Sequence, residues 1–222
     1  MRLEHYPDRA ALMQGLAQTI AGELRGALRH GPATLSVPGG TTPGPVFDAL
    51  AQMDLDWARV SVLLNDERWV GEDSDRSNTR LLRQRLLVGQ AAAAQLVPMY
   101  LPVATPEDGL DALAQAVLPH LPIAVLLLGM GNDMHTASLF PGADRLAEAL
   151  ADDAPLVMAL RAEAAGEPRI TLTAPVLKAA KRIHILITGA EKRAALERAL
   201  QLPAIEAPIR VVLDQATVHW SE

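Results

Sequence analysis

Hydrophobic side chains recur at every fourth position near the beginning of the chain. Pro7 and Asp8 precede this series, and Gly31 and Pro32 follow it. An apolar residue at each fourth position places one hydrophobic stripe along an α-helix, and proline and glycine are typical of helix boundaries. The pattern therefore predicts a long amphipathic helix between these boundaries. Its apolar stripe comprises Leu12, Leu16, Ile20, Leu24 and Leu28.

Short, nearly uninterrupted apolar runs follow this helix, and each of them ends in a polar or glycine-rich segment. Runs of this kind are typical of strands that are buried on both faces of a parallel sheet. A further strand is expected near the end of the chain, over residues 210–213, over 217–220, or over both as an edge pair. The four runs cover residues 34–37, 60–64, 123–128 and 183–187.

Helical segments separate these runs, at about residues 43–51, 76–87, 106–118, 173–180 and 190–200. Strands that alternate with helices predict an α/β fold in which helices cover both faces of a mostly parallel sheet. No internal repeat or low-complexity linker interrupts residues 1–222, so a single domain is expected. In open α/β sheets, ligands bind beyond the carboxyl ends of the strands. The polar ends of the four runs are therefore expected to converge on one site.

The composition of the 222 residues argues against several classes of protein. The 20 Lys and Arg side chains against 26 Asp and Glu give a net charge of −6, whereas general nucleic-acid binders carry a basic excess. There is no cysteine, which removes disulfides, thiol catalysis and Cys-ligated zinc. The longest apolar stretch, residues 123–130, is too short to span a bilayer. The polar N-terminus lacks the core of a signal peptide, so we expect a cytoplasmic protein that binds neither membrane nor nucleic acid.

The segment Pro38–Pro43 lies between a predicted strand and a predicted helix. Gly39 and Gly40 would let a ligand approach the backbone closely, and Thr41 and Thr42 offer hydroxyl groups. The free N–H groups at the start of the following helix would add donors for a phosphate. The alternative is a tight turn with a threonine as the helix N-cap. Taken alone, the segment favours this structural interpretation.

An acidic and basic cluster, Asp66-Glu67-Arg68-Trp69, follows the second apolar run. Arg68 could bind a phosphate or carboxylate as a two-pronged donor, with the two neighbouring acids holding it in place. The alternative is a surface charge cluster that covers the end of the sheet. Asn78, after Ser77, is either part of a helix cap or a ligand contact, and the pair taken alone favours the cap.

The most informative segment, Gly129–Gly142, begins with a Gly-X-Gly turn at a strand end. Asp133 and His135 follow, two residues apart. A histidine titrates near neutral pH and can act as a general base, and a nearby carboxylate can orient its ring. A histidine with structural hydrogen bonds at a helix start is the alternative. Because there is no Gly-X-Ser-X-Gly elbow and no second histidine at metal-ligand spacing, we expect neither a serine nucleophile nor a metal.

Two further cations are candidates for the site. Lys192 follows the run at 183–187, where the alternative is a solvent-exposed helix lysine, and Arg169 precedes Ile170–Thr173. The remaining histidines have no constellation of partners and are interpreted as structural or surface residues. They are His5, His30, His120, His184 and His219.

Five motifs occur in order between Gly39 and Trp220. They are Gly-Gly-Thr-Thr-Pro, Asp-Glu-Arg with a downstream Ser-Asn, Leu-Gly-Met-Gly-x-Asp-x-His-Thr-Ala-Ser-Leu-Phe-Pro-Gly, Arg-Ile-Thr-Leu-Thr, and Gly-x-x-Lys. This ordered set resembles the 6-phosphogluconolactonases of the short bacterial type. The resemblance implies the fold of glucosamine-6-phosphate deaminase and ribose-5-phosphate isomerase, a modified Rossmann-type sheet. The deaminases share the Gly-x-Gly-x-Asp-Gly-His segment, but the run Thr136–Pro141 is similar to the lactonases.

Two positions depart from the family pattern. Met134 stands where the family usually has glycine, and Asn132 stands where proline is common. If the glycine provides a positive φ, methionine at this position costs about 1 kcal/mol. If the glycine instead gives the substrate room, methionine would crowd the site. Asp133 and His135 themselves are retained.

The resemblance implies hydrolysis of 6-phospho-D-glucono-1,5-lactone to 6-phosphogluconate, the second step of the oxidative pentose phosphate pathway, without a cofactor. His135 would deprotonate the attacking water, and Asp133 would orient His135. Arg68, Arg169 and Lys192 would attract the phosphorylated substrate, with Lys192 and Arg68 favoured for the phosphate and the loop 39–42 as a further donor. Two alternatives stay open: an amino-sugar-phosphate isomerase or deaminase on the same fold, and a non-catalytic sugar-phosphate-binding protein.

Overall fold

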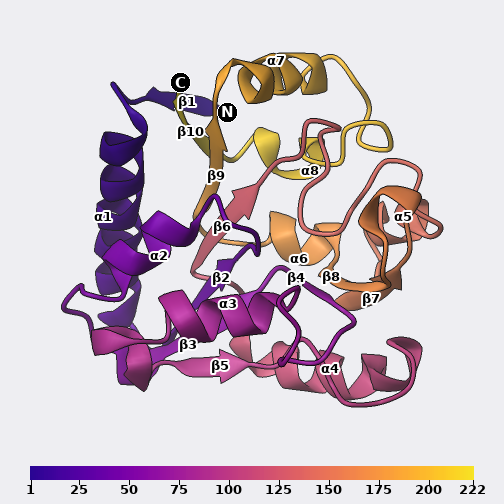
Figure 1. The fold of residues 1–222 in the computed structure, drawn as a ribbon, viewed down its shortest axis with the longest axis horizontal. Coiled ribbons are helices and arrows are strands. Elements are labelled where there is room, and N and C mark those ends of the chain that lie inside the picture. Colours follow the sequence, from indigo (N-terminus) through magenta and orange to yellow (C-terminus); the bar gives the residue numbers. More distant parts are fainter.

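A parallel sheet of seven strands forms the centre of the computed structural model, which describes residues 1–222 (Figure 1). Strands β2, β3, β6 and β9 coincide with the four predicted apolar runs, and nearly all of their residues are buried. Both faces of these strands are covered, which is why the runs are apolar throughout. In spatial order the strands are β1 (Arg2–His5), β10 (Thr217–Ser221), β9 (Ile183–Thr188), β6 (Val125–Gly129), β2 (Ala33–Val37), β3 (Val60–Leu64) and β5 (Gln95–Val97).

The first and last strands of the chain lie side by side in this sheet. β1 occupies the edge and pairs with β10, which pairs with β9. Residues 217–220 therefore form a strand as predicted, although not at the edge. The prediction of a strand at 210–213 is wrong, because Arg210–Leu213 is the short helix α8. The sequence does not predict β1, since Arg2–His5 is half-exposed and contains no apolar run.

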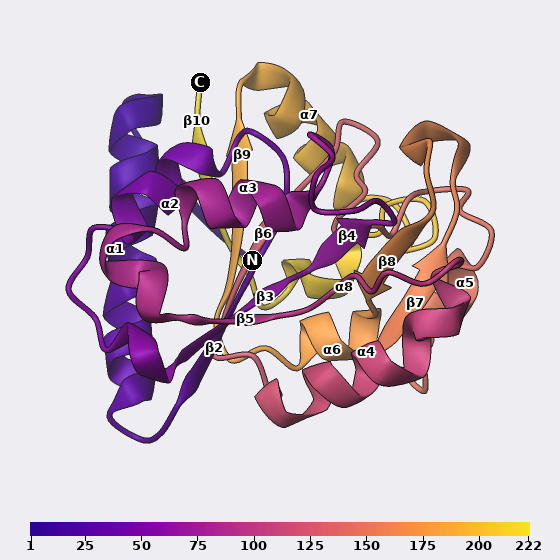
Figure 2. The same cartoon turned by 60° about the horizontal axis from the view of Figure 1, so that its bottom comes forward.

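Helices cover both faces of the large sheet, as predicted. Asp8 directly precedes α1, and its carboxylate caps the helix, because it accepts a hydrogen bond from the backbone N–H of Ala11 at 2.8 Å. All residues of its predicted apolar stripe are buried. Figure 2 shows α1 and α2 on one side of the sheet and α6 and α8 on the other. The helices are α1 (Arg9–Leu28), α2 (Gly44–Leu50), α3 (Asn78–Arg85), α4 (Leu110–Val117), α5 (Leu146–Leu150), α6 (Ala174–Lys178), α7 (Ala190–Ala199) and α8 (Arg210–Leu213).

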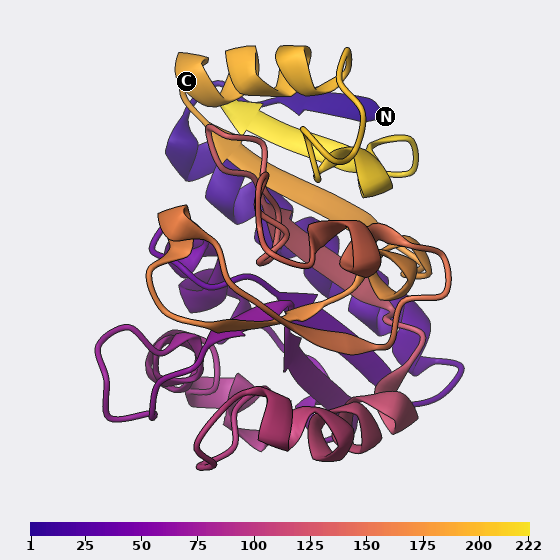
Figure 3. The same cartoon turned by 90° about the vertical axis from the view of Figure 1, so that its right-hand side faces the viewer.

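A second sheet of three antiparallel strands branches from the end of β3. β4 (Asp66–Arg68) follows β3 almost directly and pairs with β8 (Arg169–Leu172), which pairs with β7 (Val157–Leu160). Figure 3 shows β7 and β8, in orange, in front of the large sheet. The sequence does not predict this sheet. Its register bears on the site, because Arg68 lies directly opposite Arg169.

The core between these layers is almost entirely aliphatic. Aromatic residues make up 3% of the chain, and Trp57 and Phe47 are the largest of the fully buried side chains. Leucine, valine, isoleucine and alanine from the central strands and the covering helices fill the remaining interior. No helix of the structure combines the length and the apolar character that crossing a bilayer requires.

Candidate active site

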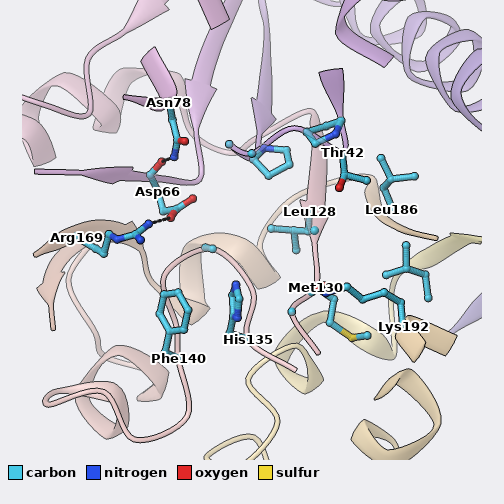
Figure 4. Close-up of a pocket in the computed structure, with 18 of the residues that line it drawn as sticks. Thr42, Asp66, Asn78, Leu128, Met130, His135, Phe140, Arg169, Leu186 and Lys192 are labelled. Carbon is cyan, nitrogen blue, oxygen red and sulfur yellow. Dashed lines mark hydrogen bonds and ion pairs between the residues drawn. The ribbon is translucent and has the colours of Figure 1, made fainter. Parts of the chain in front are cut away.

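The polar segments that follow β2, β3, β6 and β9 meet at one edge of the sheet and enclose a cavity of about 380 Å³ (Figure 4). Gly39, Asp66, Gly131 and Thr188 each line this cavity from a different one of these strand ends. The segments converge because the carboxyl ends of parallel strands lie at the same edge of a sheet. The convergence predicted from the sequence is thereby confirmed.

Most of the candidate residues line this cavity, and two do not. Asp133 lies behind His135, to which it is hydrogen-bonded. Thr41 lines a neighbouring cavity beside Arg9 and Gln14 instead. The candidates that line the cavity are Gly39, Gly40, Thr42, Arg68, Asn78, His135, Arg169 and Lys192.

His135 and Asp133 form a hydrogen-bonded pair in the turn after β6. Nδ1 of His135 lies 2.6 Å from Oδ1 of Asp133, and the same oxygen accepts the backbone N–H of His135 at 3.2 Å. Partial burial raises the pKa of Asp133, but the hydrogen bonds and the charge of His135 outweigh it, so this pKa lies below its ordinary value. The ionised carboxylate holds Nδ1, which leaves Nε2 as the ring nitrogen that can exchange a proton in the cavity.

The turn that carries this pair requires glycine at position 131. A Cβ atom on Gly131 would lie 2.2 Å from Oδ1 of Asp133 and 2.2 Å from Nδ1 of His135. These distances are far inside van der Waals contact, so any other residue would displace the pair. Gly129, two residues earlier, has no atom within 4 Å of the position that a Cβ would take.

Met134, one of the departures from the family pattern, has its backbone in the left-handed region. Its φ is 66°, and that of Ala137 is 47°. Of the two explanations for a glycine at this position, the conformational one therefore applies, with a cost of about 1 kcal/mol for methionine. The side chain of Met134 packs against the apolar core and does not line the cavity. Methionine thus strains the turn without crowding the site.

Phe140 supports the ring of His135 from one side. The two ring centroids are 4.1 Å apart, with an angle of 31° between the planes. The guanidinium carbon of Arg169 lies 5.9 Å from the centroid of the same phenyl ring, within the range of a cation–π contact. Phe140 therefore connects the candidate base to a cation (Figure 4). Phe140 belongs to a sequence motif, but nothing in its spacing indicates this role.

The acids next to Arg68 do not hold its side chain, and that expectation is wrong. Glu67 is fully buried and accepts the backbone N–H groups of Asn78 at 2.9 Å and Thr79 at 2.7 Å. It therefore satisfies the free N–H groups at the start of α3. Burial raises the pKa of Glu67, and these hydrogen bonds offset part of the rise. Arg68 instead donates to the carbonyl oxygen of Arg76 at 2.5 Å.

Asn78 is held in the cavity wall by the backbone around it. Its side-chain amide donates to the carbonyl oxygen of Asp66 at 3.0 Å. Gly39 packs directly against this amide, since a Cβ at Gly39 would lie 1.9 Å from Oδ1 of Asn78. Ser77 supplies the cap, because its hydroxyl accepts the backbone N–H of Arg80 at 3.2 Å. The cap interpretation therefore applies to Ser77, and a ligand contact of Asn78, which lines the cavity, stays a prediction.

The threonines of the glycine loop do not cap α2. Pro43 occupies the N-cap position and forms no side-chain hydrogen bond, while the backbone carbonyl of Thr41 accepts the N–H of Gly44 at 3.2 Å. Gly40 has a φ of 83°, which glycine adopts without strain. The loop thus turns between β2 and α2 through its backbone, and the side chain of Thr42 lines the cavity.

Arg68 and Arg169 lie together on one side of the cavity. They are partners across β4 and β8, and Arg169 donates to the carbonyl oxygen of Ala165 at 2.9 Å. The Nε atoms of both arginines are buried without a hydrogen-bond partner. Burial lowers the pKa of Arg169, which Asp66 opposes and Arg68 reinforces, but a guanidinium remains charged in proteins. Two cations with spare donors therefore border the cavity here.

Lys192 lies on the other side of the cavity from Arg169, with His135 between them (Figure 4). It belongs to the first turn of α7, and its Nζ donates to the carbonyl oxygen of Met130 at 2.7 Å. Partial burial lowers the pKa of Lys192, and nearby carboxylates oppose this shift. Because Arg68 pairs with Arg169 across the strands, the two cations favoured for one phosphate stand on different sides of the cavity.

His184 and His219, for which the sequence indicates no partner, belong to a buried chain of hydrogen bonds outside the cavity. Nδ1 of His184 lies 2.9 Å from Nε2 of His219. Glu23 bonds to Nε2 of His184 at 2.7 Å, and the hydroxyl of Tyr6 bonds to Nδ1 of His219 at 2.9 Å. No sequence spacing indicates this chain, because its members are far apart in sequence. No group of three or more His, Asp or Glu side chains in the chain is arranged to hold a metal ion.

Comparison with known proteins places the chain among sugar-phosphate enzymes. Residues 7–220 match the family described as glucosamine-6-phosphate isomerases/6-phosphogluconolactonase. A 6-phosphogluconolactonase of Mesorhizobium japonicum is 44% identical over 97% of this chain and 93% of its own. The crystal structure of a 6-phosphogluconolactonase from Shewanella baltica has a TM-score of 0.97 at 36% identity, over 100% of this chain and 98% of the other. A monomeric glucosamine-6-phosphate deaminase shares the fold, with a TM-score of 0.80 at 17% identity over 99% of this chain and 97% of its own.

Proposed function

The chain belongs to the glucosamine-6-phosphate isomerase/6-phosphogluconolactonase family, and we propose that it hydrolyses 6-phospho-D-glucono-1,5-lactone to 6-phosphogluconate, the second step of the oxidative pentose phosphate pathway. Relatives that are 36–44% identical over nearly the whole chain are 6-phosphogluconolactonases. The chain is accordingly a lactone hydrolase. The observation that carries the chemistry is the Asp133–His135 pair beside a cavity that is bordered by cations.

His135 acts as the general base. A lactone carbonyl is electrophilic, so an activated water can attack it without a covalent enzyme intermediate. Asp133 holds Nδ1 of His135 at 2.6 Å, and Nε2 takes a proton from the water as the oxygen bonds to the carbonyl carbon. The resulting imidazolium is stabilised by the carboxylate of Asp133. It then returns the proton to the ring oxygen as the bond between this oxygen and the carbonyl carbon breaks.

Arg68 and Arg169 serve the reacting end of the substrate. Negative charge develops on the carbonyl oxygen in the tetrahedral intermediate, and fixed donors at that position lower the barrier. Both arginines have a buried Nε without a partner, and Phe140 contacts both the ring of His135 and the guanidinium of Arg169. The oxyanion is therefore expected on this side of the cavity, with the water between it and His135.

Lys192 and the glycine loop serve the phosphate. Figure 4 shows Thr42 on the same side of the cavity as Lys192. Gly39, Gly40 and Thr42 line the cavity and supply backbone and hydroxyl donors, and Asn78 lines it as well. Thr41 contributes through the loop backbone, because its side chain lines the neighbouring cavity. This assignment gives the phosphate one cation and leaves two for the reacting end.

Residues 1–222 act in this proposal as a single catalytic domain that works in the cytoplasm, where sugar phosphates are metabolised. The substrate is a small phosphosugar lactone, and the reaction requires no cofactor. The cations at the cavity compensate for the net charge of −6, which by itself would repel a phosphorylated substrate.

The test is acid release from freshly generated lactone, measured above the spontaneous rate, with glucosamine 6-phosphate as a parallel substrate. We expect acid release from the lactone and no ammonia from the amino sugar. Ammonia release would identify a deaminase instead. Binding of 6-phosphogluconate without turnover of the lactone would identify a non-catalytic binding protein.

A further inference from the structure

A second cavity, of about 670 Å³, lies at the opposite edge of the large sheet, where its central strands begin. Its walls come from the end of α1, from the turn before β2 and from the segment between α4 and β6. None of its lining residues also lines the candidate active site. The proposed reaction therefore makes no use of this cavity.

The lining of this cavity is basic, although the protein as a whole is acidic. Glu23 is its single acidic residue, so arginine and lysine exceed carboxylates there, in a chain whose net charge is −6. Such a local reversal of sign attracts small anions and raises their concentration in the cavity. The basic lining residues are Arg29, His30, His120, Lys181 and Arg182.

The cations of this cavity are largely free of carboxylate partners. Neither Arg29 nor Lys181 forms an ion pair within the protein. Arg182 approaches one oxygen of Glu23 at 3.8 Å, but the other oxygen of Glu23 is bound to His184 at 2.7 Å. A cation at the end of α1 stabilises the helix dipole, which accounts for Arg29. It does not account for Lys181 and Arg182, which precede β9 and approach the cavity from another element.

Two hydroxyl groups lie side by side in the cavity wall. Thr34 and Ser61 are partners in register across β2 and β3, and both line the cavity. Thr34 donates to the carbonyl oxygen of His120 at 2.7 Å. The hydroxyl of Ser61 forms no hydrogen bond within the protein, and it is not one of the buried polar atoms that lack a partner. It therefore stays accessible from the cavity and can donate a hydrogen bond to a ligand there.

We propose that this cavity binds a small phosphate-bearing anion, at a site separate from the active site. Arg29, Lys181 and Arg182 supply positive charge, and Ser61 donates the hydrogen bond that it does not make within the protein. A phosphate group suits this combination, because it pairs with several charged and neutral donors at once. The cavity has the volume of a small-molecule site. The site is independent of the catalytic assignment.

The test is a titration with inorganic pyrophosphate, followed by the imidazole NMR signals of the six histidines at constant ionic strength. His30 and His120 report on this cavity, and His135 reports on the active site. We expect the signals of His30 and His120 to shift with a saturable curve of their own. The double variant Arg29→Ser/Lys181→Ser should weaken this binding by roughly tenfold or more. Shifts confined to His135, or shifts that never saturate, would overturn the proposal.

Two further variants separate this site from general charge attraction. Arg25→Ser/Lys178→Ser removes the same charge outside the cavity and should leave the affinity of pyrophosphate unchanged. If it weakens binding as much as the cavity variant does, the attraction is not site-specific and the proposal fails. Ser61→Ala retains every cation and is small enough to keep the strand packed. It should weaken binding by roughly tenfold, and an unchanged affinity would remove Ser61 from the site.

Discussion

Asp133 is hydrogen-bonded to Nδ1 of His135, which leaves Nε2 as the nitrogen that can exchange a proton in the candidate cavity, lined by His135. His135→Gln removes the base while keeping a side chain of similar length. Loss of a general base lowers kcat by about 10²–10⁴, whereas the affinity for 6-phosphogluconate, measured by calorimetry, should change little. His5→Gln, outside the cavity, is the matched control and should retain normal turnover. Normal turnover in His135→Gln would refute the assignment of the base.

Lys192 is the cation that we assign to the phosphate. Removing one charge-assisted hydrogen bond costs about 1.5–3 kcal/mol, which corresponds to roughly 10–150-fold in affinity. Lys192→Ala should therefore weaken the binding of 6-phosphogluconate by that factor. In a parallel titration, the binding of unphosphorylated gluconate should be nearly unaffected. Lys178→Ala, a surface lysine paired with Asp152, should affect neither ligand. Equal effects of Lys192→Ala on both ligands would place the phosphate elsewhere.

Arg68 is assigned to the reacting end and should respond differently from Lys192. Removing a donor that stabilises an oxyanion lowers kcat by about 10²–10³. Arg68→Ala is therefore expected to reduce kcat by a larger factor than the affinity for 6-phosphogluconate. Lys192→Ala is expected to reduce the affinity for 6-phosphogluconate by a larger factor than kcat. Steady-state kinetics together with product affinity distinguish the two patterns. A loss of product affinity in Arg68→Ala as large as its loss of kcat would show that Arg68 also contacts the phosphate.

The turn after β6 is the element that places the candidate base, and Gly131 within it allows a controlled comparison. A Cβ at Gly131 would lie 2.2 Å from both Asp133 and His135, while a Cβ at Gly22, on the exposed side of α1, meets nothing within 4 Å. Gly131→Ala should therefore lower kcat by at least about tenfold, since small misplacements of reacting groups are costly. Gly22→Ala, outside the cavity, should stay close to wild type. Lactone hydrolysis measured for both variants decides the matter, and equal activities would contradict the role given to Gly131.

Elements with a sustained pattern were predictable from the sequence, and short elements were not. The stripe Leu12–Leu28 and the apolar runs of β2, β3, β6 and β9 encode their burial directly, so α1 follows from the period of its stripe and the four parallel strands follow from their continuous apolar runs. The strands β4, β7 and β8 have three or four residues each, and β4 pairs with β8 across about a hundred positions. No local signal contains such a pairing. The sequence therefore also could not predict that Arg68 and Arg169 lie opposite each other, because the pairing of β4 with β8 brings them together.

The candidate site was predictable to the same extent as the elements that carry it. Strand ends converge by topology, which brought Gly39, Arg68, His135 and Lys192 to one cavity. The contacts within the cavity depend on side-chain directions that spacing does not specify. Glu67 therefore turned out to cap α3 rather than hold Arg68.

At the scale of the whole molecule, the parallel sheet separates two basic regions of an acidic protein. The carboxyl edge gathers Arg68, Arg169 and Lys192 around the candidate active site, and the amino edge gathers the basic cavity. Parallel strands make this separation possible, since each strand presents one end to each edge. A ligand at the amino edge would contact residues at or just before the first residues of β2, β3, β6 and β9. The carboxyl ends of the same four strands border the candidate active site.

The buried chain of Glu23, His184, His219 and Tyr6 ties the same sheet to α1. Tyr6 follows β1, His219 lies in β10 and His184 lies in β9, so three neighbouring strands and the helix share one set of hydrogen bonds. Burial, together with the charge of His184, lowers the pKa of His219 to about 3. An unfolded histidine has a pKa of about 6.5. His219 is thus neutral in the folded protein over a range in which the unfolded chain binds a proton.

This difference makes stability depend on pH in a defined direction. The folded pKa of His219 lies below the unfolded value, so protonation favours the unfolded chain. The free energy of unfolding should fall as the pH drops below about 6.5, by up to about 1.4 kcal/mol per pH unit for this one proton.

His219→Gln keeps a polar side chain but cannot titrate, so urea unfolding between pH 7.5 and 4.5 should show a slope that is shallower by about one proton than that of wild type. His219→Asn, a second variant that cannot titrate at this position, should show the same shallower slope. Parallel curves for wild type and His219→Gln would mean that His219 is protonated in the folded protein and that its burial does not govern acid stability.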